Sequence, residues 1–237
     1  MRLAALLAGL VLLAGCGGNE DEPLTVYAAS SLTEAFEQLT PAVRFNFAGS
    51  DELATQLREG AQADVYAAAS PRYPGELFEE GIVEEPIVFA TNRLVIVVPS
   101  DNPAGIRELD DLTAVDVRLV IGGEGVPIGD YTRELLERAE RPDVLERVVS
   151  EEEDVKGVLA KVALGEADAG FVYATDARAA GGDVVAIELP REFQGPIEYP
   201  VAVVRNATRA EDARRFIELL RSSRGRTALR AAGFGLP

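Results

Sequence analysis

The 237-residue sequence contains no histidine and no tryptophan, and its one cysteine is Cys16. Thiol nucleophiles, Ser-His-Asp triads and metal sites built from histidine or cysteine are therefore excluded from the chain beyond residue 16. Paired carboxylates remain available as catalytic groups, and oxygen ligands remain available for Ca²⁺. Most enzyme chemistries thus lose the side chains on which they usually depend.

Positive charge is also scarce. The sequence has 23 Lys and Arg against 40 Asp and Glu, a formal net charge of -17, and its only lysines are Lys156 and Lys161. Such an excess argues against nucleic acid or an anionic membrane surface as a partner, because both would be repelled at long range. With 47% hydrophobic residues and ordinary Gly and Pro contents, the chain is globular and long enough for one large or two small domains.

An apolar run of residues 3–12 follows Arg2 and ends in Leu-Ala-Gly-Cys at residues 13–16. The run is too short to span a hydrocarbon core of about 30 Å. A small-residue box ends secretory signals, and a cysteine directly after it is the bacterial lipoprotein pattern. We therefore predict a signal peptide over residues 1–15, a diacylglycerol on Cys16 and a flexible tether over 16–23. The protein is expected outside the cytoplasm, held to the membrane only by this lipid.

Short apolar strands alternate with amphipathic helical patterns from residue 24 onward. This βαβα order predicts an α/β fold with parallel strands covered by helices. About ten strands are too many for one small sheet, so two lobes are expected. The expected strands are 24–27, 43–47, 64–68, 94–98, 118–121, 169–173, 184–187 and 199–204. The expected helices include 53–57, ended by Gly60, and 131–139, 155–164 and 213–220.

Four segments lead into a predicted helix, namely residues 28–34, 47–53, 122–131 and 151–157, and the first three of them follow a predicted strand. Ligands of α/β sheets bind at such places, where helix N-termini offer unpaired N–H groups and the positive end of the dipole. Ser31 with Glu34 forms a capping-box pattern, and Ser50 opens a helix. Each serine taken alone is therefore more simply a helix cap than a ligand contact.

The other two segments carry glycines and acids. Residues 122–131 open with three glycines, at 122, 123 and 125, ahead of a helix, which suits a backbone-lined anion site or an ordinary flexible loop. They lack the Lys-Ser/Thr ending of a P-loop, so nucleotide binding is not predicted. Residues 151–157 place acids at a helix start without EF-hand spacing, so a Ca²⁺ site is disfavoured. Tyr173 at a strand end is a packing residue or a hydroxyl donor.

Seven segments form an ordered set covering nearly the whole chain after the tether, residues 26–33, 47–50, 63–66, 126–131, 153–157, 171–177 and 199–203. This set resembles the substrate-binding proteins of molybdate ABC transporters, a subset of the periplasmic-binding-protein type II family. The sequence departs from the family pattern at Ile128, where the family has alanine, and at Gly122-Gly123-Glu124-Gly125, which replaces Asp-Pro-Glu. These departures bear on pocket size and on the choice among oxyanions.

The resemblance implies a two-lobed fold in which each lobe is a mainly parallel sheet flanked by helices. The chain would cross between lobes near residues 86–93 and 192–200. Lobe I would comprise residues 24–87 and 198–237, and lobe II residues 88–197. The resemblance further implies that oxyanion contacts come from the hydroxyl and N–H groups of Ser31 and Ser50, the N–H groups of Ile128 and Val155, and the hydroxyl of Tyr173.

The function implied by the resemblance is an extracytoplasmic lipoprotein that captures molybdate or tungstate between its lobes and delivers it to an ABC permease. It would be a monomer with no catalytic residue, no cofactor and no resident metal, because molybdate is bound as an oxyanion. Neutral donors suit a fully ionised dianion and disfavour protonated oxyanions such as phosphate. They act at contact range, whereas the net charge is screened beyond ~8 Å.

Other functions stay open at this point. The same fold would serve for sulfate, phosphate or a small organic acid, and an Arg in the cleft, with Arg93 the one to check, would pair with a carboxylate. A surface hydrolase would need two carboxylates from Asp51, Glu52, Glu124 and Asp130, one of them with a raised pKa. A lipoprotein serving only surface interaction would leave the four helix starts without a purpose.

Overall fold

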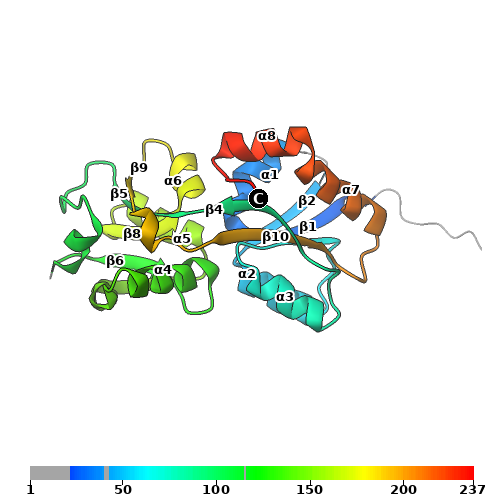
Figure 1. The fold of residues 1–237 in the computed structure, drawn as a ribbon, viewed down its shortest axis with the longest axis horizontal. Helices are drawn as coiled ribbons and strands as arrows, with labels where there is room; N and C mark the ends of the chain where they lie inside the picture. Colours follow the sequence, from blue (N-terminus) through cyan, green and yellow to red (C-terminus); the bar gives the residue numbers. More distant parts are fainter. Residues whose placement is uncertain (1–21, 40–42, 115) are drawn as a thin grey trace, which may run out of the picture.

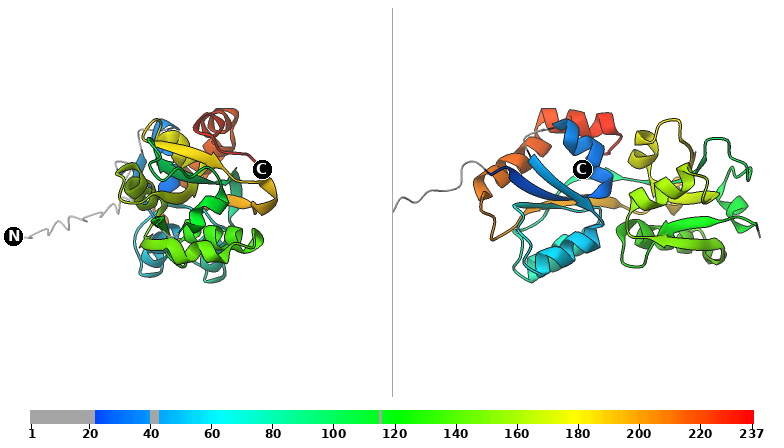
Figure 2. Two further views of the ribbon diagram at one scale, coloured as in Figure 1. Left: turned by 90° about the vertical axis from the view of Figure 1, so that its left-hand side faces the viewer. Right: turned by 180° about the vertical axis from the view of Figure 1, so that it is seen from behind.

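The structure, a computed structural model, describes residues 22–39, 43–114 and 116–237. Cys16, the predicted signal peptide and most of the predicted tether lie outside the described residues. Two five-stranded sheets lie side by side along the long axis, each flanked by helices (Figure 1), and two further views show the same two lobes (Figure 2). The two-lobed α/β fold predicted from the sequence is therefore confirmed.

Lobe I holds the sheet with strand order β2-β1-β3-β10-β4. Its strands are β1 (Leu24–Ala29), β2 (Val43–Ala48), β3 (Val65–Ala67), β4 (Ile87–Asn92) and β10 (Ile197–Val203). Its helices are η1 (Ser30–Leu32), α1 (Thr33–Leu39), α2 (Ser50–Arg58), α3 (Arg72–Glu79), α7 (Ala210–Arg221) and α8 (Ser223–Ala232). The C-terminal segment returns to this lobe, where Gly235 pairs with Thr91 of β4.

Lobe II holds the sheet with strand order β7-β6-β8-β5-β9. Its strands are β5 (Leu94–Pro99), β6 (Leu119–Gly122), β7 (Val148–Glu152), β8 (Ala169–Tyr173) and β9 (Val184–Glu188). Its helices are η2 (Leu109–Thr113), α4 (Pro127–Arg138), η3 (Pro142–Arg147), α5 (Val155–Ala163), α6 (Ala174–Ala179) and η4 (Arg191–Phe193).

Each sheet has one reversed strand. In lobe I, β1, β2 and β3 pair in parallel, β10 runs antiparallel to β3, and β4 runs antiparallel to β10. In lobe II, β6 pairs in parallel with β7 and β8, while β5 is antiparallel to both β8 and β9. Four of the five strands in each sheet thus share one direction, so their carboxyl ends meet at one edge.

The chain crosses between the sheets twice. Arg93 alone separates β4 of the first sheet from β5 of the second, and residues 194–196 separate η4 from β10. Because β4 pairs with β10, residues 88–92 belong to the first sheet, which extends lobe I past the boundary expected at residue 87. The polar end of β4 carried no clear strand signal, because its last two residues are Thr91 and Asn92.

Three further elements differ from the expectation. The strand β7 was not predicted, because it is a half-exposed edge strand ending in two glutamates. The helix α8 was not predicted either, since its sequence is rich in arginine and alanine with few apolar residues. The helix α4 begins at Pro127, four residues ahead of the expected start at Tyr131, because proline fits the first helical position.

The cores of the two lobes are built differently. Lobe I packs an aromatic cluster between its sheet and the helices α1 and α7, with Phe36 in tilted or edge contact with Phe45, Phe89 and Phe216 at centroid distances of 5.4–6.0 Å. Lobe II relies on fully buried strands that are mainly aliphatic, and every residue of β5, β6 and β8 is buried. Within the described ranges, no helix is long and apolar enough to cross a membrane.

Candidate functional site

A small pocket lies between the lobes, at the carboxyl ends of strands from both sheets. It is lined by residues 29–31, 48–50, 126–128 and 154–155 together with Ala69 and Tyr173. The four lining segments are the starts of η1, α2, α4 and α5, and Tyr173 ends β8. The structure therefore brings Ser31, Ser50, Ile128, Val155 and Tyr173, which lie far apart in the sequence, to one place.

The pocket is small. Its empty space is about 210 Å³, of which only about 10 Å³ admits the centre of a water molecule. That is close to the room that one water needs. A pocket of this size suits a compact ligand.

Ser31 does not cap a helix, contrary to the capping-box interpretation. It lies inside η1, whose N-cap is Ala29, and its buried hydroxyl is 2.9 Å from the hydroxyl of Tyr199. Glu34 reaches Lys156 of lobe II at 2.7 Å instead of returning to the start of its own helix. The tertiary partners of both side chains have replaced the local hydrogen bonds on which the capping interpretation rested.

Ser50 is likewise not an N-cap. The N-cap of α2 is Gly49, and Ser50 is the first residue of the helix. Its Oγ accepts a hydrogen bond from the N–H of Ala69 at 3.0 Å, and its carbonyl accepts one from the hydroxyl of Tyr66 at 2.7 Å. These two bonds fix Ser50 in place. Neither of them uses the hydroxyl proton of Ser50, which therefore stays free to be donated.

The starts of α4 and α5 add backbone donors. Ile128 follows Pro127 in the first turn of α4, and Val155 is the first residue of α5. N–H groups in a first turn have no acceptor within the helix, and they carry the positive end of its dipole. The carboxylate of Asp154 caps α5 by accepting from the N–H of Gly157 at 2.9 Å, so this acid is engaged by its own helix.

Tyr173 contributes a buried hydroxyl group to the pocket. Only 1% of it is exposed, and its hydroxyl is buried without a hydrogen-bond partner among the described residues. Burial raises the pKa of Tyr173 well above its usual value, so the phenol keeps its proton and remains a donor. A buried polar atom without a partner is costly, and a ligand oxygen in the pocket would supply the missing acceptor.

A charge cluster joins the lobes beside Ser31 and Val155. Lys156 Nζ lies 2.7 Å from Glu34 Oε1 of lobe I and 3.2 Å from Asp176 Oδ1 of its own lobe. Asp176 is fully buried, and burial, partly offset by Lys156, raises the pKa of its carboxyl to about 6. No sequence pattern indicated this cluster. The one available signal was a single acid, Asp176, among small residues at the start of segment 174–180.

The acids considered for a hydrolase lie next to the pocket but outside it. Asp51, Glu52 and Glu124 line an open acidic groove between the lobes. Asp130 is held by the N–H of Gly125 at 2.9 Å and by Arg72. Burial is the main cause of the raised pKa of Asp51, and the nearby charges of Glu52 and Asp130 add to it.

Arg93, the residue to check for an organic-acid ligand, does not line the pocket. Its guanidinium pairs with Glu188 at 3.0 Å on the outer side of lobe II, and half of the side chain is exposed. The described residues that line the pocket include no Lys or Arg. In the part of the chain that the structure describes, no group of three or more His, Cys, Asp or Glu could hold a metal ion.

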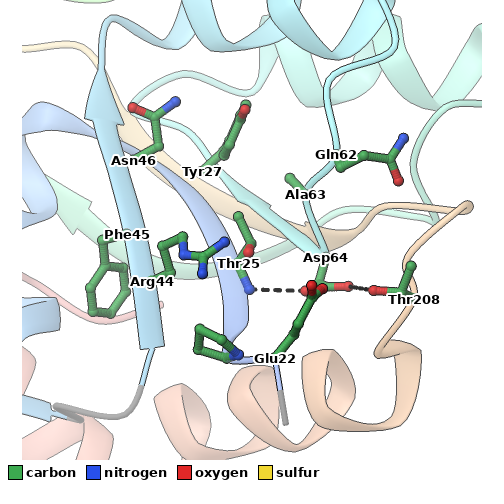
Figure 3. Close-up of a pocket in the computed structure, with 11 residues that line it drawn as sticks. Glu22, Thr25, Tyr27, Arg44, Phe45, Asn46, Gln62, Ala63, Asp64 and Thr208 are labelled. Atoms are coloured by element: carbon green, nitrogen blue, oxygen red, sulfur yellow. Dashed lines mark hydrogen bonds between the residues drawn. The ribbon is translucent and has the colours of Figure 1, made fainter. Parts of the chain in front are cut away.

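A second hollow of about 520 Å³ lies at the opposite end of the lobe I strands (Figure 3). Asp64, which is buried there, accepts from the N–H groups of Thr25 at 2.9 Å and Arg209 at 3.0 Å and lies near the hydroxyl of Thr208 (Figure 3). Because its carboxylate ties three segments of lobe I together, Asp64 serves the fold. None of the predicted site residues lines this hollow.

The chain is similar throughout its length to known proteins. The family described as "Bacterial extracellular solute-binding protein" matches residues 24–235. The "Molybdate-binding protein ModA" of Mycobacterium tuberculosis is 36% identical over 256 residues, covering 99% of this chain and 95% of the relative. The protein of the same name from Haemophilus influenzae is 31% identical over 252 residues, covering 99% of both chains.

Solved structures share the fold at lower identity. The periplasmic molybdate-binding protein of Azotobacter vinelandii superposes with a TM-score of 0.81 at 21% identity, over 90% of this chain and 99% of that one. The sulfate-binding protein SubI of Mycobacterium tuberculosis gives a TM-score of 0.78 at 18% identity, over 90% of this chain and 86% of that one. Both likenesses extend to the two-lobed architecture described above.

Proposed function

The chain belongs to the bacterial extracellular solute-binding proteins, and from that premise we propose that it captures molybdate or tungstate in the pocket between its lobes. The observation that carries the proposal is the buried hydroxyl of Tyr173, which lacks an acceptor among the described residues at a pocket otherwise lined by helix starts. Ser31, Ser50, Ile128 and Val155 would supply the remaining donors. A tetrahedral dianion offers oxygens in every direction and needs no cation in the lining.

Closure of the lobes would accompany binding. The donors come from both lobes, so a bound oxyanion gains most when both reach it, and only such differential affinity shifts the equilibrium. Arg93 and residues 194–196, where the chain crosses, would act as the hinge. We further propose that the closed monomer docks on an ABC permease and that a lipid on Cys16 keeps it at the cell surface. No catalytic residue and no cofactor form part of this function.

The first test measures the thermal stability of residues 22–237 with molybdate, tungstate, sulfate or phosphate. Ligand at 100 times its dissociation constant adds about 2.7 kcal/mol. For a chain of this size that raises the midpoint by roughly 5–11 °C. A rise with molybdate and tungstate alone is expected. A rise with sulfate or phosphate alone would move the ligand to that oxyanion, and no rise with any of the four would contradict the proposal.

Tyr173→Phe removes the unpaired hydroxyl and keeps the ring. A hydrogen bond to a charged acceptor contributes about 1.5–3 kcal/mol, so molybdate affinity should fall by roughly 10- to 150-fold in calorimetry. The edge contact between the rings of Tyr173 and Tyr199 at 5.8 Å should survive. Tyr27→Phe is the matched control, because Tyr27 lines the hollow of Figure 3 and not the pocket. Equal losses in both variants would remove Tyr173 from the site.

Ser50→Ala removes a second donor and also the acceptor of the Ala69 N–H. Molybdate affinity should weaken by more than about tenfold, again as the loss of one charge-assisted bond. Ser70→Ala is a suitable control, since the Ser70 hydroxyl likewise accepts a backbone N–H, that of Arg72, but does not line the pocket. An unchanged affinity by calorimetry would exclude Ser50 from the site.

A further inference from the structure

Asn92 has a fixed orientation at the hinge. It is the last residue of β4, and its Oδ1 accepts the N–H of Arg93 at 3.0 Å. A backbone N–H can only donate, so this bond identifies the oxygen of the side-chain amide. The amide nitrogen, Nδ2, therefore faces the opposite way. It lies 2.9 Å from Thr175 Oγ1 of lobe II and 3.4 Å from the hydroxyl of Tyr199.

This orientation decides which way the hydroxyl of Tyr199 turns. Nδ2 of Asn92 has no lone pair to offer, so at that contact the Tyr199 oxygen is the acceptor. The single proton of the phenol then goes to its other neighbour, Ser31 Oγ, at 2.9 Å. The reverse arrangement, with Ser31 donating to Tyr199, would leave the phenol proton buried without an acceptor, which is costly. Burial also raises the pKa of Tyr199 well above its usual value, so this proton is retained.

Ser31 is thereby set as a donor toward the pocket. Its Oγ accepts the proton of Tyr199, and its own single proton remains for a group in the pocket. The hydroxyl of Ser50 is also restricted to donating toward the pocket, but by a different contact, because its Oγ accepts the N–H of Ala69. The hydroxyl oxygens of Ser31 and Ser50 thus both accept a hydrogen bond from the protein. Each is left with one proton to donate to a ligand.

From this arrangement we propose that Asn92 and Tyr199 are specificity-determining positioning residues, which fix Ser31 as a donor so that the site selects fully deprotonated oxyanions. Neither residue lines the pocket. An oxyanion that carries a proton must place that proton against an acceptor, and a serine locked as donor provides none. The proposal rests on the proposed function and explains how neutral hydroxyls, which can both donate and accept, are restricted to one role.

Asn92→Asp tests the relay by reversing its polarity. A carboxylate at this position still accepts the N–H of Arg93, but its second oxygen now accepts the proton of Tyr199. Ser31 must then donate to Tyr199, and its lone pair faces the ligand. The measurement is the calorimetric affinity for molybdate and for inorganic phosphate at mildly alkaline pH. Phosphate is then mainly a dianion that keeps one proton.

The two ligands separate polarity from charge. The negative charge added by Asn92→Asp repels both dianions alike, so the ratio of the two affinities reports hydrogen-bond polarity alone. Asn92→Asp should lower the molybdate-to-phosphate ratio by about tenfold or more. Tyr199→Phe keeps the ring contacts with Tyr173 and Phe234 and frees Ser31 to rotate, so the ratio should fall in the same direction.

Tyr66→Phe is the matched control. Tyr66 is also a buried tyrosine with one hydrogen bond beside a pocket serine, but its hydroxyl donates to the Ser50 carbonyl and not to the side-chain oxygen. The Tyr66→Phe variant should be less stable than the wild type, and its molybdate-to-phosphate affinity ratio should be unchanged. If the wild type binds molybdate but Asn92→Asp and Tyr199→Phe both keep the wild-type affinity ratio, the positioning role of Asn92 and Tyr199 is overturned and the proposed function stands. A wild type that binds none of the oxyanions would overturn the proposed function and the relay with it.

Discussion

Replacing Lys156 by methionine is expected to destabilise the protein by an amount that grows with pH. In the wild type the buried carboxyl of Asp176 has a pKa of about 6, with burial raising it from the usual 3.8 and Lys156 at 3.2 Å limiting the rise. Without the ammonium, burial and the nearby charges of Glu34 and Asp154 act unopposed, and Asp176 stays protonated to higher pH. The folded variant then holds one proton more than the folded wild type throughout the range above the wild-type pKa.

The sign follows from proton linkage. Above pH 6 the unfolded chain and the wild-type fold are both deprotonated at Asp176, whereas the variant fold is protonated. The stability of the variant therefore falls relative to wild type as pH rises, by about 1.4 kcal/mol for each pH step. Chemical denaturation should show a difference near zero at about pH 5 and about 1–2 kcal/mol at pH 7, and it should keep growing until the pH reaches the raised pKa of Asp176 in the variant.

Two further variants isolate the cause. The double variant Lys156→Met with Asp176→Asn has no titrating carboxyl at this place, so its stability relative to Asp176→Asn should not slope with pH. Lys161→Met is the matched control in the same helix, since Lys161 pairs at 2.6 Å with Glu152, which keeps some exposure. Its loss should stay below about 1 kcal/mol without a comparable slope. A flat difference between Lys156→Met and wild type from about pH 5 to 9 would contradict the linkage.

The sequence was sufficient to find the groups that line the pocket. Strand ends and helix starts follow from local patterns, and four such segments in an α/β chain must meet at the carboxyl edges of two sheets. Within these segments the family resemblance implied Ser31, Ser50, Ile128, Val155 and Tyr173, and the structure places all five at one pocket. Their role toward a ligand remains a prediction.

The residues that orient these groups were not found, for a physical reason. Tyr199 meets Ser31 across 168 positions of sequence, and Asn92 meets Tyr199 across 107. No local pattern encodes such contacts, because they arise only when β10 enters the first sheet between β3 and β4. The same contacts explain the error at Ser31, whose capping-box pattern is locally sound and is overridden by a tertiary partner. Tyr199 lay within a family-like segment, yet its hydroxyl had no predicted role.

A second large effect is expected from Gly129→Ala in the first turn of α4. A Cβ at this position would lie 2.2 Å from the carbonyl oxygens of both Gly122 and Gly123, which end or follow β6. These are backbone atoms, so no side-chain rotation relieves the clash. The start of α4 must move away from the strand, at a cost of about 1–3 kcal/mol in stability.

The displacement reaches the site because Gly129 directly follows Ile128. As a proposed ligand donor, the N–H of Ile128 would be withdrawn from the pocket when the first turn of α4 moves, and a misplacement of about 1 Å can cost on the order of 100-fold where groups must converge. Calorimetry with molybdate should therefore show a loss of roughly 100-fold, together with a lower melting temperature. The binding loss is of the same order as that expected for removing the Tyr173 hydroxyl, but here it comes with a loss of stability, since the whole helix start moves.

Gly75→Ala provides the comparison that makes this result interpretable. Gly75 lies within α3, and a Cβ there would meet nothing within 4 Å. Alanine should stabilise that helix by about 0.5–1 kcal/mol and leave binding unchanged, because only the conformational freedom of the unfolded chain is reduced. If Gly129→Ala bound molybdate as tightly as Gly75→Ala, the N–H of Ile128 would not be a ligand donor. The pocket would then depend on the serines, Val155 and Tyr173 alone.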